Sequence, residues 1–455
     1  MIASMQILER LRAHASDTPD RLALREITTG RTMSWSQLSA AARQFASRLT
    51  ESVGAGATVM LRCPNACEFH ITFLGALAAG MTVFPISHEI TAVEFQAAAE
   101  KSSASAVVAA DLSIGKLHGT SRTDGPALLL QSSGTTGLPK IVRRDGRSLD
   151  AVSANMVGAI GIDTRDHVLA CVPLCHSYGL EHGLLAPIFA GASVHLTQGF
   201  DLATVRRELK DSGLTIFPAV PSMYEMLGNL SDRDGKFPGL RLAYSAGGPL
   251  PTSVFQKMFD PFGFSIGQLY GATEVGSITF AHPTDAYFDP ASVGRVMPGV
   301  ELRIDADDQL LVRATSMMSS YVGDDSPFTP DGFFPTGDLA RLDDHGNLFI
   351  TGRRKFLIDV GGLKVNPAEV EQAIAQHPAV AACVVVPMRL SETVFRLKAI
   401  VTPVDPTHPP GGDALRAFAR ACLTAYKVPR VFEVRQTLPR SPTGKILRHL
   451  LVESA

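Results

Sequence analysis

The pattern that most constrains the fold is a repeated alternation of helical and strand-like segments through roughly the first 110 residues. Helical stretches such as SWSQLSAAARQFASRL and EFHITFLGALAAG alternate with short apolar runs such as ATVMLRC and MTVFPIS. The alternation continues through residues 166–250. Repeated strand–helix–strand order places helices on the faces of a largely parallel sheet, so the sequence predicts an α/β fold built in layers.

Two later changes of pattern divide the chain. From about residue 292 to residue 350 short strands with turn signals predict a small antiparallel part. A charged break, GRRK, then precedes a small α+β pattern whose first helix starts with Asn366 as N-cap and Pro367 in the first turn. We expect a large N-terminal domain over residues 1–352, a hinge over 353–356 and a small, mobile α+β C-terminal domain over 357–455.

Composition excludes several classes of function. A net charge of −2 gives no reason to expect a nucleic-acid partner. The apolar run at residues 168–174 is too short to cross a bilayer, so we expect no integral membrane segment. The N-terminus has the spacing of an amphipathic helix rather than of a signal peptide. The six cysteines lack zinc-site spacing, which favours buried thiols in a reducing, cytoplasmic compartment.

A glycine- and hydroxyl-rich loop follows the buried-strand pattern at residues 128–130. It is not a P-loop, because Pro139 rather than Gly precedes the lysine and Ile141 rather than a hydroxyl follows it. Backbone N–H groups, hydroxyls and a cation nevertheless suit a polyphosphate, and glycines permit close approach. The predicted phosphate-binding residues are Ser132, Ser133, Gly134, Thr135, Thr136, Gly137 and Lys140.

Five further stretches line up with this loop: PLCHSYGL, SAGGPL, QLYGATE, PTGDLARLDDHGNLFITGRRK and PRSPTGKILR. In order and spacing, over essentially the whole chain, the set resembles the adenylate-forming superfamily of acyl-CoA synthetases, carrier-protein ligases, adenylation domains and firefly luciferase. One departure is RRDGRS, which stands after the loop where the family usually has a Thr-His pair. The resemblance implies an AMP-forming acid–thiol ligase that uses ATP and Mg²⁺.

The resemblance also implies how the nucleotide is held. The loop binds the β- and γ-phosphates, and a backbone edge at residues 246–248 lies against adenine and the acyl group. In YGATE, an aromatic ring faces adenine, a hydroxyl meets the α-phosphate and a carboxylate binds Mg²⁺, which needs few carboxylates beside phosphate oxygens. A later carboxylate accepts both ribose hydroxyls. These residues are Ala246, Gly247, Gly248, Tyr270, Gly271, Ala272, Thr273, Glu274, Asp338 and Arg353, the last reaching ribose or phosphate.

For the acid and the thiol, the resemblance places His176 near the carboxylate and Lys445 in the active site during adenylation. No aspartate around His176 is available for a substrate ammonium, so an uncharged organic acid, fatty or aromatic, is favoured. Small residues at Ala219, Ala246, Gly247 and Gly276 suggest an open acyl pocket. Rotation of the small domain about Lys355 then brings Gly361 and Gly362 to line the thiol channel.

The expected reaction joins an organic carboxylic acid to coenzyme A through an acyl-adenylate, releasing pyrophosphate and then AMP. One alternative acceptor is the phosphopantetheine thiol of an acyl carrier protein. Another alternative is luciferase-like oxygenation of the adenylate, which shares all of these motifs. A non-catalytic nucleotide-binding regulator is disfavoured because five charged residues of the motifs are all present: Lys140, Glu274, Asp338, Arg353 and Lys445.

Overall fold

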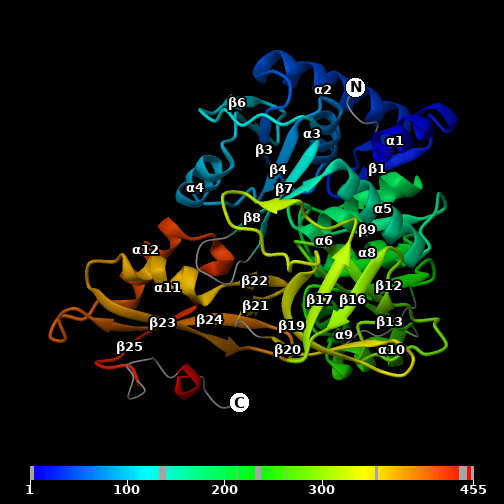
Figure 1. Cartoon of the computed structure of the whole chain (residues 1–455). Coiled ribbons are helices and arrows are strands. Elements are labelled where there is room, and N and C mark those ends of the chain that lie inside the picture. The colour runs from blue at the N-terminus through cyan, green and yellow to red at the C-terminus, as the bar shows by residue number, and fades with distance from the viewer. Residues whose placement is uncertain are drawn as a thin grey trace. The chain divides into compact units, whose positions relative to one another are not determined.

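The structure, a computed structural model, describes residues 5–132, 140–211, 213–230, 237–262, 264–353, 357–439 and 448–451 (Figure 1). The chain forms two compact units. The larger comprises Met1–His88, Ala99–Ser132 and Ile141–Arg354. The smaller comprises Glu89–Ala98, Ser133–Lys140 and Lys355–Ala455.

A nine-stranded sheet forms one layer of the larger unit, in the order β15-β14-β13-β12-β11-β9-β10-β1-β2. Its strands from β13 to β1 run parallel, and both edges are closed by antiparallel strands. The strands are β1 (Leu22–Glu26), β2 (Thr32–Ser34), β9 (His167–Ala170), β10 (Ser193–Leu196), β11 (Ile216–Ala219), β12 (Leu242–Ser245), β13 (Ile266–Ala272), β14 (Gly276–Ala281) and β15 (Arg295–Val296).

A second, seven-stranded sheet has the order β18-β8-β7-β4-β3-β5-β6. Strands β7, β4, β3 and β5 are parallel, as the alternation in the sequence predicts. The strands are β3 (Thr58–Arg62), β4 (Thr82–Ile86), β5 (Ala106–Ala109), β6 (Ile114–Lys116), β7 (Ala127–Ser132), β8 (Lys140–Asp145) and β18 (Ser320–Tyr321).

Helices follow most of these strands, which confirms the layered α/β fold. Side chains cap several of their starts: Ser34 and Gln37 form a reciprocal capping box at α2, Asp145 caps α5, and Thr91 and Asp201 accept N–H groups from the first turns of α4 and α8. The helices are α1 (Gln6–Asp17), α2 (Trp35–Val53), α3 (Cys67–Ala78), α4 (Ala92–Ser102), α5 (Gly146–Ile160), α6 (Ser177–Leu180), the π-helical turn η1 (Glu181–Leu185), α7 (Ala186–Ala190), α8 (Leu202–Asp211), α9 (Pro221–Gly228) and α10 (Thr252–Phe262).

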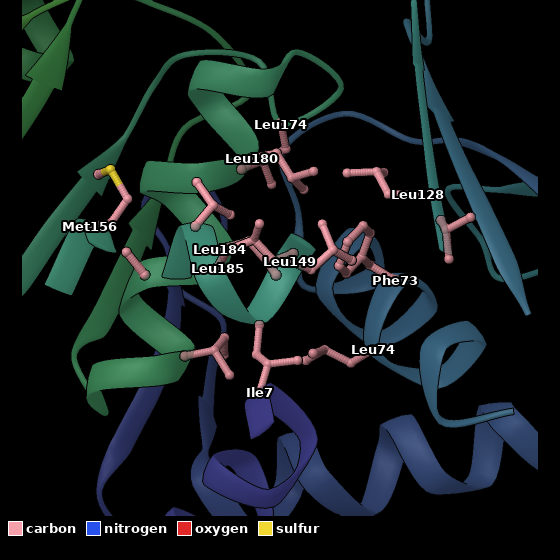
Figure 2. Close-up of a cluster of buried hydrophobic side chains, with 14 of the residues drawn as sticks. Ile7, Phe73, Leu74, Leu128, Leu149, Met156, Leu174, Leu180, Leu184 and Leu185 are labelled. Atoms are coloured by element: carbon pink, nitrogen blue, oxygen red, sulfur yellow. The ribbon is translucent and has the colours of Figure 1, made fainter. Parts of the chain in front are cut away.

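The main hydrophobic core joins these layers. Figure 2 shows part of this core, in which Phe73 of α3 lies beside Leu149 of α5 and Leu74 lies beside Ile7 of α1, and Leu180, Leu184 and Leu185 belong to the same cluster. Because α6, η1 and α7 follow one another without a break, their apolar residues face this core continuously. The segment that follows His176 therefore packs into the main hydrophobic core.

The expected antiparallel part is also confirmed. Four antiparallel strands, in the order β16-β17-β19-β20, form a separate sheet of the larger unit. They are β16 (Val300–Ile304), β17 (Gln309–Ala314), β19 (Phe334–Leu342) and β20 (Leu348–Arg353). Their pairing places residues 338 and 353 opposite each other.

The smaller unit is α+β with its own core. Helix α11 begins at Pro367, and the Asn366 side chain accepts the Ala368 N–H at 3.0 Å, as the sequence predicts. The other elements are β21 (Ile358–Val360), β22 (Leu363–Val365), α11 (Pro367–Ala375), β23 (Val380–Arg389), β24 (Phe395–Pro403), α12 (Gly412–Cys422), the single turns η2 (Ala425–Lys427) and η3 (Arg448–Leu450), and β25 (Val431–Val434).

Two further findings concern membranes and thiols. Among the helices of the described residues, none has the length and apolar character needed to cross a membrane. All six cysteines are free, and Cys63, Cys67 and Cys171 are buried. Burial raises the pKa of each of these three thiols to about 12, so they act as small apolar side chains.

Candidate active site

Two residues that the sequence assigns to the nucleoside lie side by side. The Tyr270 hydroxyl, at the end of β13, donates a 2.6 Å hydrogen bond to Oδ2 of Asp338 on β19. Asp338 is buried, and the register of β19 and β20 pairs it with Arg353. The structure therefore brings Tyr270, Asp338 and the backbone of Arg353 to one place. The second carboxylate oxygen of Asp338 has the acceptor capacity that a ribose diol needs.

The YGATE stretch is a tight hairpin between β13 and β14. Gly271 pairs with Ser277 and Ala272 with Gly276, and the Val275 N–H donates to the Ala272 carbonyl at 3.0 Å. A Cβ at Gly271 would lie 2.7 Å from the carbonyl oxygen of Gly276, so only glycine fits. The turn itself consists of Thr273 and Glu274, both half-buried, and the buried Val275.

Glu274 is held by residues that the sequence reading missed. The Tyr321 hydroxyl donates to Oε1 of Glu274 at 3.0 Å, and the Met318 N–H donates to the Glu274 carbonyl at 2.7 Å. Tyr321 lies on β18, opposite Val142 of β8, the strand that follows the phosphate loop. Burial, and then the negative charge of Glu274, raise the pKa of Tyr321, which keeps its phenol a hydrogen-bond donor.

The donor chemistry at Glu274 fits Mg²⁺. Its Oε1 is fixed by Tyr321, and the carboxylate keeps acceptor capacity for a metal on its second oxygen. Mg²⁺ prefers one or two carboxylates together with phosphate oxygens and water. Within the part of the chain that the structure describes, no group of three or more His, Cys, Asp or Glu side chains could hold a metal ion.

The start of the phosphate loop carries an unusual hydroxyl. Ser132 ends β7, and its buried Oγ has no hydrogen-bond partner among the described residues. Since buried hydroxyls are nearly always paired, this atom suits a ligand oxygen. Lys140 begins β8. Seven of the predicted residues lie outside the described residues: Ser133, Gly134, Thr135, Thr136, Gly137, the hinge residue Lys355, and Lys445.

The RRDGRS stretch, which departs from the family, has two structural roles. Asp145 is the N-cap of α5 and accepts the Ser148 N–H at 2.9 Å. Arg144 is fully buried, where its Nε donates to Ser148 Oγ at 3.0 Å and its Nη1 donates to Glu181 Oε1 at 2.8 Å. The stretch therefore replaces the family's pair with a capping aspartate and a buried ion pair.

Glu181 connects this ion pair to the rest of the site. Its Oε1 also accepts from the Ser177 hydroxyl at 2.9 Å, and its Oε2 accepts from the N–H and the hydroxyl of Ser277, at 3.1 and 2.8 Å. Ser177 follows His176, and Ser277 follows the YGATE hairpin. One neutralised carboxylate thus ties the phosphate strand, the His176 segment and the hairpin together.

The ends of parallel strands gather the residues predicted to meet the acid. His176 precedes α6 and is half-buried, and Ala219 ends β11. The Ala246 N–H donates to the Ala219 carbonyl at 3.3 Å, and Gly247 follows with a φ of +86°. Ligands of α/β sheets commonly bind at this carboxyl edge. The position of Gly248, next in the chain, continues the same turn.

Gly276, which we expected to widen the acyl pocket, faces the protein core instead. Its φ is +86°, and a Cβ there would lie 2.8 Å from Val152 Cγ2 and 3.0 Å from Arg144 Nη2. The glycine is required by packing against the buried arginine. That part of the pocket prediction is wrong.

The two glycines predicted for the thiol channel form the turn between β21 and β22 in the smaller unit. Gly361 and Gly362 have φ values of +66° and +90°, a region that favours glycine. Asp359 Oδ1 accepts the Gly362 N–H at 2.6 Å, and its Oδ2 accepts from Lys364 Nζ at 2.6 Å. The turn alone accounts for both glycines.

Comparison with known proteins gives consistent results. The sequence matches the family described as AMP-binding enzyme over residues 11–123 and 116–322, and the AMP-binding enzyme C-terminal domain over residues 369–445. Similar proteins include the 2-succinylbenzoate–CoA ligase of Bacillus velezensis, 32% identical over 72% of this chain and 69% of the relative.

Two further likenesses extend over nearly the whole chain. A CoA ligase of Rhodococcus jostii, named for a methyl-dioxo-octahydroindenyl propanoyl group, is 28% identical over 92% of this chain and 93% of the relative. A solved structure of o-succinylbenzoate CoA synthetase from Bacillus subtilis, bound with a product analogue, has a TM-score of 0.87 at 26% identity, covering 97% of this chain and 98% of that one. The chain belongs to the AMP-binding enzyme family and is an AMP-forming acid–thiol ligase.

Proposed function

We propose that this ligase activates an organic carboxylic acid with an uncharged tail, fatty or aromatic, and passes the acyl group to coenzyme A. In the first half-reaction the acid attacks the α-phosphate of ATP, giving acyl-adenylate and pyrophosphate. In the second, a thiol displaces AMP and forms the thioester. The relatives named above are CoA ligases, which supports coenzyme A as the acceptor.

The observation that carries this proposal is the hydrogen-bonded Tyr270–Asp338 pair beside the hairpin that presents Thr273 and Glu274. In our proposal, Tyr270 packs against adenine together with the backbone edge at residues 246–248. Asp338 accepts the ribose hydroxyls, with Arg353 beside it. Thr273 donates to the α-phosphate.

The remaining charged residues would bind the phosphates or the metal ion that accompanies them. Glu274 would hold Mg²⁺, which neutralises phosphate charge when bound. Ser132, the rest of its loop and Lys140 hold the β- and γ-phosphates. Lys445 meets the negative charge that develops as the carboxylate attacks, and a placed cation contributes most where water is excluded. A hinge over residues 353–356 lets the domain over 357–455 rotate between the half-reactions.

The electrostatics around His176 support an uncharged tail. Glu181, five residues after His176, is buried and is bound by Arg144, Ser177 and Ser277. Because the negative charge of Glu181 is balanced by the Arg144 guanidinium, Glu181 does not serve as a counter-charge for a substrate ammonium. An α-amino acid would therefore bring a charge into this region without a counter-charge, at a high desolvation cost.

Two other outcomes share the first half-reaction. The acceptor could be the phosphopantetheine thiol of an acyl carrier protein, because both acceptors present the same thiol arm. The adenylate could also react with oxygen, as in luciferase. Only the second half-reaction separates the three.

ATP–pyrophosphate exchange across a panel of acids tests the proposal. We expect exchange with fatty or aromatic acids and little with free α-amino acids. Active acids are then offered coenzyme A or a holo carrier protein, with oxygen uptake and light emission recorded in parallel. Exchange with amino acids alone would contradict the proposed acid class. If the thioester forms only on the carrier protein, the carrier protein and not coenzyme A is the acceptor.

A further inference from the structure

A small cavity lies among the segments that carry His176 and Ala219. Its volume is about 10 Å³, and its lining residues include Val172, Tyr178, His182 and Pro218. Pro218 precedes Ala219, and the Tyr178 hydroxyl donates towards the Ala219 and Tyr244 carbonyls, at 3.2 and 3.3 Å. The cavity is thus walled by the same segments as the proposed acid site.

His182 is the polar group of this cavity that is left without a partner. Its side chain is buried, and its Nδ1 is hydrogen-bonded to the Tyr244 hydroxyl. Its Nε2 is also buried and has no partner among the described residues. Buried polar atoms are almost always paired, so an open ring nitrogen in a cavity calls for a ligand atom.

The chemistry of that ligand atom follows from the histidine. Burial lowers the pKa of His182 to about 3, so the ring is neutral. We assign the Tyr244 hydroxyl as the donor to Nδ1, because a buried phenol proton needs an acceptor, and this assignment puts the ring proton on Nε2. Nε2–H is then an unused donor that needs an acceptor. A neutral oxygen meets a neutral donor at a lower desolvation cost than a carboxylate does.

A bound water alone is a poor acceptor for the Nε2–H of His182 in this cavity. A buried water usually makes about three hydrogen bonds, whereas this cavity is lined largely by apolar side chains and glycines. An oxygen that is covalently part of the acid is held there by the rest of the substrate. The histidine also lies in the π-helical turn η1, a distortion that often occurs at functional sites.

We propose that His182 is a specificity-determining residue that selects acids whose tail carries a neutral acceptor oxygen, such as a keto or ether group. This inference rests on the proposed function, because it concerns the same acid site. His176 and His182 are six residues apart, or about 9 Å along a helix. The oxygen should therefore lie some way down the tail, away from the reacting carboxylate.

Matched pairs of acids test the proposal. One series compares oxo acids of five to eight carbons, oxygen on the penultimate carbon, with the corresponding hydrocarbon acids. A second pair is para-methoxybenzoate and para-ethylbenzoate. We expect wild-type kcat/KM for pyrophosphate release to favour the oxygen-bearing acid by about tenfold in at least one pair, since a site built to hydrogen-bond rejects an analogue that lacks the partner.

Three variants locate the effect. His182→Leu should lower this ratio by about tenfold, whereas His182→Gln, which keeps an N–H donor, should retain most of it. His195→Leu is the matched control, because His195 is a buried histidine of β10 whose two ring nitrogens lack partners among the described residues and which does not line this cavity. If His182→Leu fails to fold by circular dichroism, the wild-type ratio and His182→Gln decide.

Two results overturn the proposal. One is a wild-type preference for the hydrocarbon acid in every pair. The other is an unchanged ratio in folded His182→Leu, which would mean that the cavity holds only a structural water. Failure of the proposed function has a different signature, in which the folded wild-type enzyme exchanges pyrophosphate with none of these acids.

Discussion

The hydroxyl of Tyr270 and Oδ2 of Asp338 lie 2.6 Å apart, joining the β13–β14 hairpin to the antiparallel sheet. The bond orients the Asp338 carboxylate at the edge of the antiparallel sheet. It also fixes the tyrosine ring at the end of its strand. Two residues 68 positions apart in the sequence are therefore set in place by each other.

Removing this bond should weaken nucleotide binding while leaving the ring in place. We expect Tyr270→Phe to raise KM for ATP about threefold to tenfold, which corresponds to about 0.7–1.4 kcal/mol and lies within the range of a typical net hydrogen bond. Asp338→Ala should raise it further. Steady-state pyrophosphate release measures both effects. Tyr287→Phe, at an exposed tyrosine, is the control. An unchanged KM in Tyr270→Phe would mean that Asp338 needs no such positioning.

The Tyr321–Glu274 bond leads to a prediction about magnesium. Glu274→Gln should lower the adenylation rate severely, because an amide lacks the charge that the metal needs. Tyr321→Phe keeps the carboxylate but loses its anchor, and partners of metal ligands typically contribute 10–100-fold to metal affinity. We therefore expect Tyr321→Phe to need roughly tenfold more Mg²⁺ for half-maximal adenylation.

Saturating Mg²⁺ should restore most of the activity of Tyr321→Phe but not that of Glu274→Gln. A merely structural role for Tyr321 would instead lower the rate equally at every Mg²⁺ concentration. Near-normal turnover of Glu274→Gln at ordinary Mg²⁺ would show that Glu274 is not the ligand.

Much of this architecture could be predicted because it is encoded locally. The parallel layers follow from alternating apolar periods, and the start of α11 follows from Asn366 and Pro367. The YGATE residues could be assigned to one site because they are contiguous, although the hairpin that they form was not predicted. Such features depend on neighbours in sequence, which a single chain displays directly.

The partners across the fold could not be predicted. Arg144 and Glu181 are 37 residues apart, and RRDGRS carries no sign that its second arginine is fully buried. The same holds for Tyr321 and for the His182–Tyr244 pair. The prediction that Gly276 widens the acyl pocket was wrong for a related reason, because a small residue is equally compatible with an open pocket and with a crowded core. Only the tertiary structure distinguishes the two.

Buried histidines predict how stability depends on pH. Burial lowers the pKa of His70 and His195 to about 4 and that of His182 to about 3, from a usual value near 6.5. The unfolded state therefore takes up protons first. The contribution of these histidines to the free energy of unfolding is fully present above about pH 6.5. It is lost as pH falls, by at most about 1.4 kcal/mol per pH unit for each histidine.

Urea unfolding between about pH 7 and pH 5 measures this slope, in a range where carboxylates contribute little. His195→Leu should reduce the slope, because it removes one of the three groups. An equal slope in that variant and the wild type would mean that His195 is not protonated on unfolding in this range.

The last prediction concerns the division of labour between the half-reactions. If Lys445 acts on the adenylating carboxylate and phosphate, Lys445→Ala should nearly abolish adenylation and still convert a supplied acyl-adenylate to thioester. Gly362→Leu should do the opposite, because a side chain there would fill the proposed thiol channel. Lys355→Pro, which restricts φ at the proposed hinge, should also spare the first step more than the second.

The φ of +90° at Gly362 makes a control necessary, since any side chain there strains the turn whether or not a channel exists. Gly346→Leu supplies it: Gly346 has a φ of +78° in a turn of the larger unit, where a Cβ would meet nothing closer than 4.0 Å. It should lose stability yet keep both half-reactions. If Gly362→Leu also keeps thioester formation at equal stability, the turn serves the fold alone. Equal damage to both steps in folded Lys445→Ala would contradict the assignment of that lysine to adenylation.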